Sequence, residues 1–216
     1  MTARATARRM VECCRQLAAR GLIAGQDGNL SVRLSPNRVL VTPAGLIKSL
    51  LLPSDMVEVD SAGRKRRGRR NPTSELDLHL RILRRRRDVA AVVHAHPPTA
   101  TGFATAGEEL DAFALPELIF LIGRVPLVPY GTPGTPALAD RVEPFLAEHD
   151  ALLLANHGAV TLGRTLNEAW VRMESLEHAA LILWTARTLG RVTPLAHEAV
   201  EQLQRLRARA HRERDA

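Results

Sequence analysis

Two histidines separated by a single residue end a short apolar run in this sequence of 216 residues. His94 and His96 follow residues 89–93, which are valine and alanine, and precede two prolines. Such a run predicts a buried strand, and residues two apart on a strand point to the same face. Neutral ring nitrogens in that geometry could bind one zinc-like ion. The alternative is that both are hydrogen-bonded structural residues at a strand end.

A third histidine and a carboxylate occupy comparable positions. His157 follows Asn156 just after the uncharged run 151–155, which predicts the end of another buried strand. Glu75 is expected in the first turn of a helix over residues 72–87, where the helix dipole favours an acid. His79 lies four residues further along the same side of this helix. The pair could itself chelate a metal, or Glu75 could be no more than a helix-stabilising carboxylate.

Two glycine-containing loops and one helix start offer groups that bind anions. Residues 25–29 supply backbone amides and the side-chain amide of Asn29, although the loop could also be an ordinary turn. Residues 42–48 supply a threonine hydroxyl, backbone amides and the ammonium of Lys48. The predicted helix start at Thr73-Ser74 is a further anion site, because free backbone N–H groups point outward there.

The elements that must position these residues follow from hydrophobic spacing. Apolar periodicity predicts helices over residues 3–20, 72–87, 99–106 and 166–190 and one ending near 149, with strands over 38–42, 56–60, 89–96, 125–128 and 151–155 and another after Gly28. Glu117 stands alone among leucine and isoleucine in residues 111–123. Because a buried unpaired charge is costly, this carboxylate must be exposed or must serve a partner or a site.

Length and composition predict one domain, with two as the outside case, because 45% of the residues are hydrophobic and can form one sizeable core. No apolar stretch reaches the roughly 20 residues of a membrane helix, and the N-terminal residues lack the apolar segment of a secretory signal. We therefore expect a cytoplasmic protein. Cys13 and Cys14 are adjacent, which disfavours a disulfide between them, so packing in a reducing compartment is their expected role.

The net charge of +7 raises the question of nucleic-acid binding. The basic residues concentrate in 64–70, 84–87 and 205–214, and the chain holds only four Phe, two Trp and one Tyr. Because aromatic side chains do not alternate with these runs, a base-stacking platform is absent. We interpret the runs as solvated loops or helix ends and do not expect nucleic acid as a partner.

Taken together and in order, five short motifs resemble the class II aldolase/adducin family: Gly28-Asn29, Thr42-Pro43-Ala44-Gly45, Thr73-Ser74-Glu75, His94-Ala95-His96 and Asn156-His157-Gly158. The resemblance covers about residues 5–195. It implies a single-domain α/β fold with a mostly antiparallel central sheet flanked by helices. It also implies a homotetramer with sites at subunit interfaces. Residues 1–195 are then the family domain, and residues 196–216 form a basic C-terminal helix or tail.

The resemblance implies a metal site made of His94, His96 and His157, with Glu75 as a further ligand or as the proton carrier. His79 matches a family position that is not counted among the ligands. Three imidazoles leave an open coordination position, as expected of a catalytic zinc ion (Zn2+). The implied contacts to the substrate phosphate are Asn29, Gly45, Thr73 and Ser74, with assistance from Lys48.

The implied activity is carbon–carbon cleavage of a ketose 1-phosphate, such as fuculose 1-phosphate, to dihydroxyacetone phosphate and an aldehyde through a metal-stabilised enediolate. Two residues depart from the pattern. Ala44 replaces an expected hydroxyl residue, and Glu117 stands near the position of a proton-donating tyrosine. Either Glu117 is the catalytic acid, or the substrate differs.

Other activities on the same scaffold remain open: pentulose-phosphate 4-epimerase, methylthioribulose-phosphate dehydratase and sugar-acid phosphate decarboxylase. The family also includes adducin-type interaction domains that lack the metal site. Presence of the three histidines and Glu75 argues against that non-enzymatic role.

Overall fold

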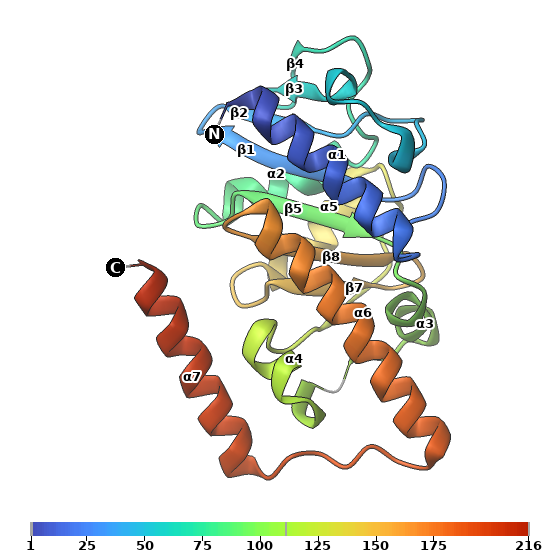
Figure 1. Ribbon diagram of the computed structural model, residues 1–216, viewed down its shortest axis with the longest axis vertical. Helices are drawn as coiled ribbons and strands as arrows, with labels where there is room; N and C mark the ends of the chain where they lie inside the picture. The colour runs from blue at the N-terminus through green and yellow to red at the C-terminus, as the bar shows by residue number, and fades with distance from the viewer. Residues whose placement is uncertain (1, 111, 216) are drawn as a thin grey trace.

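An eight-stranded sheet forms the middle layer of the computed structural model, which describes residues 2–110 and 112–215 (Figure 1). The strand order is β4-β3-β2-β1-β5-β8-β7-β6. All neighbours pair antiparallel except β6 and β7, which are parallel. The predicted α/β fold with a mostly antiparallel sheet is confirmed. The strands are β1 (Asn29–Ser35), β2 (Arg38–Val41), β3 (Val57–Val59), β4 (Lys65–Arg67), β5 (Ala91–Ala95), β6 (Leu127–Val128), β7 (Ala151–Leu154) and β8 (Gly158–Gly163).

Helices cover both faces of the sheet. In Figure 1, α1 and α6 lie in front of the strands, and α2 and α5 lie behind them. Each face carries its own cluster of buried apolar side chains, which is the arrangement that buries the apolar stripe of each helix. The helices are α1 (Ala3–Ala19), α2 (Leu76–Arg85), α3 (Pro98–Ala106), α4 (Pro116–Leu121), α5 (Pro136–Val142), α6 (Leu166–Leu189) and α7 (His197–Asp215).

Strand β5 lies inside the sheet, between β1 and β8, and it has the predicted alternation of faces. Val93 belongs to the cluster under α1 and α6, whereas Val92 belongs to the cluster under α2 and α5. His94 pairs with Asn29 of β1 on one side and with Val160 of β8 on the other. Because directly paired residues share a face, the side chains of His94 and Asn29 both point toward α2.

The start of α2 differs from the prediction. The helix begins at Leu76, so Glu75 is its N-cap rather than a residue of the first turn, and the carboxylate makes no cap hydrogen bond. The Thr73 hydroxyl instead accepts the N–H of Glu75 at 3.3 Å, which holds the chain in a turn just before the helix. The Glu75 carboxylate is therefore free to serve another part of the protein.

Prolines shorten two other predicted elements. Pro126 has no N–H to donate, and Val125 forms only an isolated bridge, so the strand expected over 125–128 is reduced to β6. The helix expected to reach residue 149 ends at Val142, because Pro144 opens a tighter turn there. The first basic run, expected as a solvated loop, contains the exposed edge strand β4.

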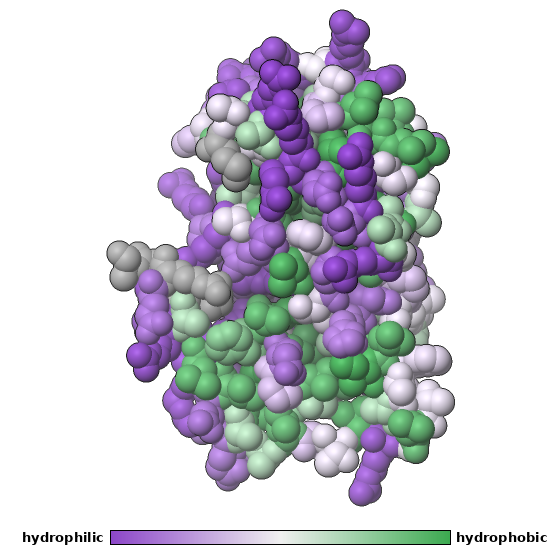
Figure 2. Space-filling model, viewed as in Figure 1, coloured by the Kyte–Doolittle hydropathy of each residue, from purple (hydrophilic) through white to green (hydrophobic). Residues whose placement is uncertain are grey.

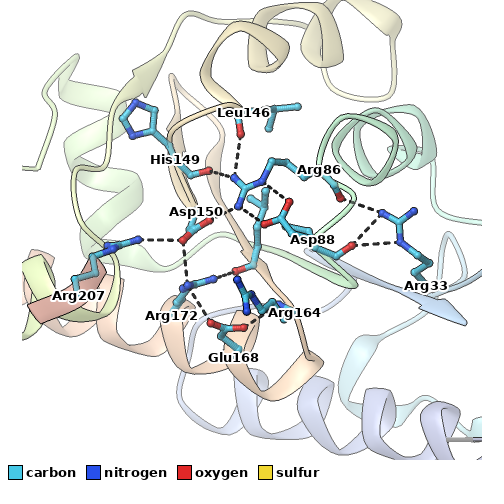
Figure 3. Close-up of polar contacts among 12 residues, drawn as sticks. Arg33, Arg86, Asp88, Leu146, His149, Asp150, Arg164, Glu168, Arg172 and Arg207 are labelled. Carbon is cyan, nitrogen blue, oxygen red and sulfur yellow. Dashed lines mark hydrogen bonds and ion pairs between the residues drawn. The ribbon is translucent and has the colours of Figure 1, made fainter. Parts of the chain in front are cut away.

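One buried carboxylate ties three distant segments together (Figure 3). Asp150, just before β7, accepts from Arg86 at the end of α2 at 2.8 Å, from Arg172 of α6 at 3.0 Å and from Arg207 of α7 at 3.0 Å. The segment 196–216 was expected to be a basic helix or tail, and the ion pair of Arg207 attaches its helix to the core.

Cys13 and Cys14 are buried and unpaired. Burial raises the pKa of the Cys14 thiol to about 12, so the thiol stays protonated and packs as a small apolar group. Within residues 2–110 and 112–215, no helix is long and apolar enough to cross a membrane.

Candidate metal centre

Three imidazoles meet at the carboxyl end of β5. His94 lies on β5, His96 directly follows it, and His157 lies in the turn that joins β7 to β8. One ligand atom from each ring lies within 4.8 Å of the other two. The ring centroids are 4.9 Å apart for His94 and His96, 4.7 Å for His94 and His157, and 5.1 Å for His96 and His157. The structure thus brings together the three histidines that the sequence singled out.

The turn that presents His157 requires two special neighbours. Asn156 adopts a φ of 56°, a left-handed conformation that asparagine tolerates better than most residues. Gly158 provides room, because a Cβ there would lie 2.6 Å from the Ala95 carbonyl oxygen and 2.7 Å from Cδ2 of His96. The Asn-His-Gly motif therefore lets the start of β8 approach the end of β5 closely enough for the rings to meet.

Hydrogen bonding orients the central ring. Nδ1 of His94 lies 2.9 Å from the Ala159 carbonyl oxygen, which can only accept, so Nδ1 carries the proton. In the neutral ring, Nε2 then offers its lone pair, and it lies 3.1 Å from Nε2 of His96. A backbone carbonyl that fixes the ring this way is typical of metal-binding histidines. The His96 side chain is 28% exposed, which leaves this side of the centre open to solvent.

Glu75 lies against the same rings. Its Oε2 is 3.2 Å from Nε2 of His94, and its Oε1 is 3.4 Å from Nε2 of His157. Asn29 donates from Nδ2 to Oε2 at 2.7 Å. Burial alone would raise the pKa of the Glu75 carboxyl, but the charge and hydrogen bond that His94 supplies when it is protonated, together with the Asn29 amide, hold it well below its usual range. The carboxylate is therefore ionised at neutral pH.

The surrounding charges and burial shift the pKa of His94 in one direction and those of His96 and His157 in the other. Burial would lower the pKa of His94, but the adjacent charge and hydrogen bond of Glu75 raise it overall. Burial and the charge of His94 lower the pKa of His157 to about 4, and the same two causes lower the pKa of His96. His96 and His157 are therefore neutral at pH 7, in the form that binds a metal.

The donor set fits a divalent cation. Oε1 of Glu75 is buried and has no hydrogen-bond partner among the described residues. A buried carboxylate oxygen without a partner is costly, and a cation between it and the ring nitrogens would remove that cost. Three imidazole nitrogens with one carboxylate oxygen are ligands that zinc-type ions prefer. Within the described part of the chain, no other group of His, Cys, Asp or Glu meets the same geometric criterion.

The loops expected to bind phosphate lie side by side near this centre. The N–H of Ala44 donates to Asn71 at 3.1 Å, and the N–H of Thr73 donates to Thr42 at 3.0 Å. At Gly45, which has a φ of +70°, a Cβ would meet no atom within 4 Å, so this amide borders open space.

The expected phosphate contacts differ in their accessibility. Ser74 is exposed, whereas Thr73 is buried and uses its hydroxyl to hold the N–H of Glu75. The Asn29 amide is also buried and donates to Glu75. Gly45 and Ser74 are thus the expected contacts that face outward.

Lys48 is not placed to contact a phosphate directly. Its ammonium is buried and donates to the carbonyl oxygens of Gln26 at 2.7 Å and Leu46 at 3.0 Å. Its backbone N–H donates to Gly25 at 3.0 Å. Lys48 therefore joins the two glycine loops, a structural task that residue type and spacing could not distinguish from substrate binding.

Glu117 is exposed on α4, so its carboxylate carries no burial cost there. The next two residues, Leu118 and Ile119, are buried and attach the helix to the core. In the described part of the chain, Glu117 makes no hydrogen bond or ion pair with the histidines. Within the described part of the chain, Glu117 is thus exposed and does not join the metal centre of its own chain.

His79 turns away from the metal centre. Its Nδ1 lies 2.7 Å from the Ser31 hydroxyl, and its Nε2 is hydrogen-bonded to Oδ1 of Asn29. Both ring nitrogens are used within the protein, so the suggested Glu75–His79 chelate does not form. Ser31 is a contact that the motifs did not indicate, although its position two residues from Asn29 on the same strand face is a signal that could have identified it.

The comparisons with known proteins agree with the fold and with the family that the motifs resemble. The family described as class II aldolase and adducin N-terminal domain matches residues 8–184. L-fuculose phosphate aldolase of Methanococcus vannielii is 38% identical over 170 residues, which cover 79% of this chain and 91% of the relative. A 5-methylthioribulose-1-phosphate/5-deoxyribulose-1-phosphate aldolase of Rhodospirillum rubrum is 34% identical over 194 residues, which cover 90% of this chain and 87% of the relative.

A solved structure extends this likeness to three dimensions. It is a putative aldolase/epimerase/decarboxylase from Escherichia coli, with a TM-score of 0.87 and 30% identity over 94% of this chain and 100% of that one. Class II aldolases depend on a metal, and the three clustered histidines are consistent with that dependence. The family predicted from the five motifs is confirmed: the chain belongs to the class II aldolase and adducin family, as one of its lyases.

Proposed function

We propose that this protein cleaves a ketose 1-phosphate into dihydroxyacetone phosphate and an aldehyde. The observation that carries the proposal is the convergence of His94, His96, His157 and Glu75 at one point. The two relatives are named for a fuculose phosphate and for 5-deoxyribulose and 5-methylthioribulose 1-phosphates. All are phosphorylated ketoses that differ in the part released as aldehyde. We therefore expect the same phosphorylated fragment here and leave the aldehyde to experiment.

The three histidines would hold Zn2+, with Oε1 of Glu75 beside it. When bound, the cation supplies a Lewis acid that draws electrons from the ketose carbonyl and stabilises the charge developed during cleavage. Glu75 is ionised, and one of its oxygens has no hydrogen bond, so it can take the proton of the C4 hydroxyl. The C3–C4 bond breaks, C4 becomes the aldehyde carbon, and the bonding electrons move toward the C2 oxygen. Return of a proton to C3 completes dihydroxyacetone phosphate.

The substrate phosphate is proposed to lie between the loop at Gly45 and the turn before α2. The Gly45 amide and the Ser74 hydroxyl border open space there, and the N-terminus of α2 favours an anion. Thr73 and Asn29 support this surface from behind through their bonds to Glu75. Lys48 contributes by holding the loops together, and its buried charge adds a favourable potential.

Glu117 is proposed as a second acid that works in the site of a neighbouring subunit.

We propose a homotetramer, because the exposed apolar residues Leu181, Ile182 and Trp184 lie on α6. Figure 2 shows apolar side chains gathered over α4 and the second half of α6 on this face. Large exposed apolar patches mark interaction surfaces. Light scattering after size exclusion should give four times the 23.7 kDa chain mass. The two buried free cysteines suit the cytoplasm as the site of action.

The deciding experiment offers zinc-loaded protein a panel of ketose 1-phosphates that includes L-fuculose 1-phosphate and 5-deoxyribulose 1-phosphate. Released dihydroxyacetone phosphate is measured through its reduction coupled to NADH oxidation. We expect at least one substrate to release it, and we expect Glu75→Gln to keep the fold and lose most of the rate. Consumption of substrate without a three-carbon product would overturn the aldolase assignment. It would favour an epimerase, dehydratase or decarboxylase on this scaffold.

A further inference from the structure

His79 is the buried titratable group nearest the metal centre that the proposed reaction does not use. It lies on α2, one helical turn after Glu75, and it is wholly inaccessible to solvent. Its two ring nitrogens contact Ser31 and Asn29, both from β1, and neither contact is a proposed metal ligand. Asn29 therefore lies between the His79 ring and Glu75 and connects the two by hydrogen bonds.

The donor and the acceptor can be assigned for each hydrogen bond that links Glu75, Asn29, His79 and Ser31. The Glu75 carboxylate only accepts, so the group of Asn29 that faces it at 2.7 Å must be the Nδ2 amine. The other end of the Asn29 side chain is then the oxygen, which also only accepts, so Nε2 of His79 carries a proton. Burial lowers the pKa of His79 to about 3, so the ring is neutral and Nδ1 is bare. Nδ1 therefore accepts the hydroxyl proton of Ser31 at 2.7 Å.

The orientation of the Asn29 side-chain amide depends on both of its neighbours, Glu75 and His79. An isolated asparagine amide can rotate by half a turn and present its oxygen to the carboxylate, which would be repulsive. The proton on Nε2 of His79 adds to this repulsion, because two N–H groups would then face each other, so His79 favours the same orientation that the Glu75 carboxylate requires. His79 acts on Asn29 in the way that the Ala159 carbonyl acts on His94, by fixing which end of a side chain faces the centre.

We propose that His79 is a positioning residue that locks the Asn29 amide and, through it, holds Oε2 of Glu75 in place. The lock gives the two carboxylate oxygens different tasks. Oε2 is held by Asn29, whereas Oε1 has no hydrogen bond and remains available to the cation and to the substrate proton. The inference rests on the proposed function for the role of Oε1, but the amide lock itself can be measured without any substrate.

The test compares His79→Leu, which removes the donor, with His79→Gln, which can still offer an N–H to Asn29. Zinc affinity is measured by competition with a chromophoric chelator in the absence of substrate. We expect His79→Leu to weaken zinc binding by about ten- to a hundredfold, the usual effect of losing such a supporting hydrogen bond, and His79→Gln to recover most of it. Thr161→Val is the matched control. It removes a different buried hydrogen-bonding group, the Thr161 hydroxyl that donates to the Ala169 carbonyl oxygen at 2.7 Å, and should lower stability without changing zinc affinity.

A second measurement follows the side-chain amide protons of Asn29 by NMR, with the signal assigned from Asn29→Asp. These protons should exchange slowly with solvent in the wild type and in His79→Gln and faster in His79→Leu. Zinc affinity unchanged in His79→Leu, or weakened equally in both His79 variants, would overturn the proposal. If the wild type binds zinc but cleaves no ketose phosphate, only the proposed function fails. If the wild type binds no zinc, the proposed function fails, and equal amide exchange in wild type and His79→Leu would refute the lock.

Discussion

Asp150→Asn tests whether one buried carboxylate holds three segments of the chain together. Asp150 is 6% exposed and accepts from Arg86, Arg172 and Arg207 at 2.8 to 3.0 Å. Asparagine has nearly the same shape, so the substitution removes the charge and one acceptor without leaving a cavity. The three guanidinium groups would stay in place around a neutral amide, which presents an N–H to at least one of them.

The expected magnitude follows from the bonds that survive. Removing one partner of a buried ion pair typically costs about 3–5 kcal/mol. Two of the arginines keep another carboxylate, because Arg86 also pairs with Asp88 at 2.8 Å and Arg172 with Glu168 at 3.0 Å. Among the residues that the structure describes, Arg207 keeps a hydrogen bond only to the Ile119 carbonyl, at 3.5 Å. We therefore expect a loss of about 3 kcal/mol in the free energy of unfolding, at the lower end of that range.

Urea unfolding followed by circular dichroism measures this loss directly. The control is Asp88→Asn, because Asp88 has a side chain that is 46% exposed and forms its ion pair with Arg86. A partly exposed pair of this kind should contribute about 1 kcal/mol or less. Because Arg207 loses its anchor, limited proteolysis in residues 190–196 should also be faster in Asp150→Asn. Equal and small losses in the two variants would refute the argument that burial makes the Asp150 cluster strong.

Three further outcomes are expected. His94→Ala should abolish zinc binding, measured as metal content after dialysis, because it removes the central ligand; stoichiometric zinc in this variant would remove His94 from the site. Gly158→Ala should lower both zinc affinity and melting temperature, since its Cβ would lie 2.6 Å from a carbonyl oxygen; wild-type values for both would show that the turn can relax. In zinc-free protein, His79 and His157 have pKa values of about 3 and 4, below the unfolded value of 6.5. The unfolded chain therefore binds more protons between these values, and stability should fall from pH 6.5 toward pH 4 by at most about 1.4 kcal/mol per group and pH unit. The slope should be shallower in His79→Gln, and an equal slope would contradict the assignment.

Local pattern was enough to predict the centre of the site. The valine and alanine run before His94 has the period and the proline boundary of a buried strand, and these features depend only on neighbouring residues. The same holds for the strand end at His157, which the structure places beside His94 and His96. The motif order added the carboxylate of Glu75, whose position between two rings is not visible in any single motif.

Contacts between distant residues could not be predicted in this way. Lys48 has the same residue type as a phosphate-binding lysine, and only the packing of the loops shows that its ammonium is buried against carbonyl oxygens. His79 lies on the same helix side as Glu75, but the register of β1 against β5 brings Asn29 between them. The N-cap position of Glu75 depends on a single hydroxyl contact from Thr73, which helix propensity does not include.

The exposed edge strand β4 explains why this open sheet of eight strands does not grow by pairing with strands of other molecules. Its residues Lys65–Arg67 place cationic side chains along the unpaired backbone, so an identical edge from another molecule would meet electrostatic repulsion. The opposite edge, β6, is only two residues long and offers little template for addition. The positive charge that suggests nucleic acid in the sequence thus has a protective value here: it opposes edge-to-edge aggregation of the chain.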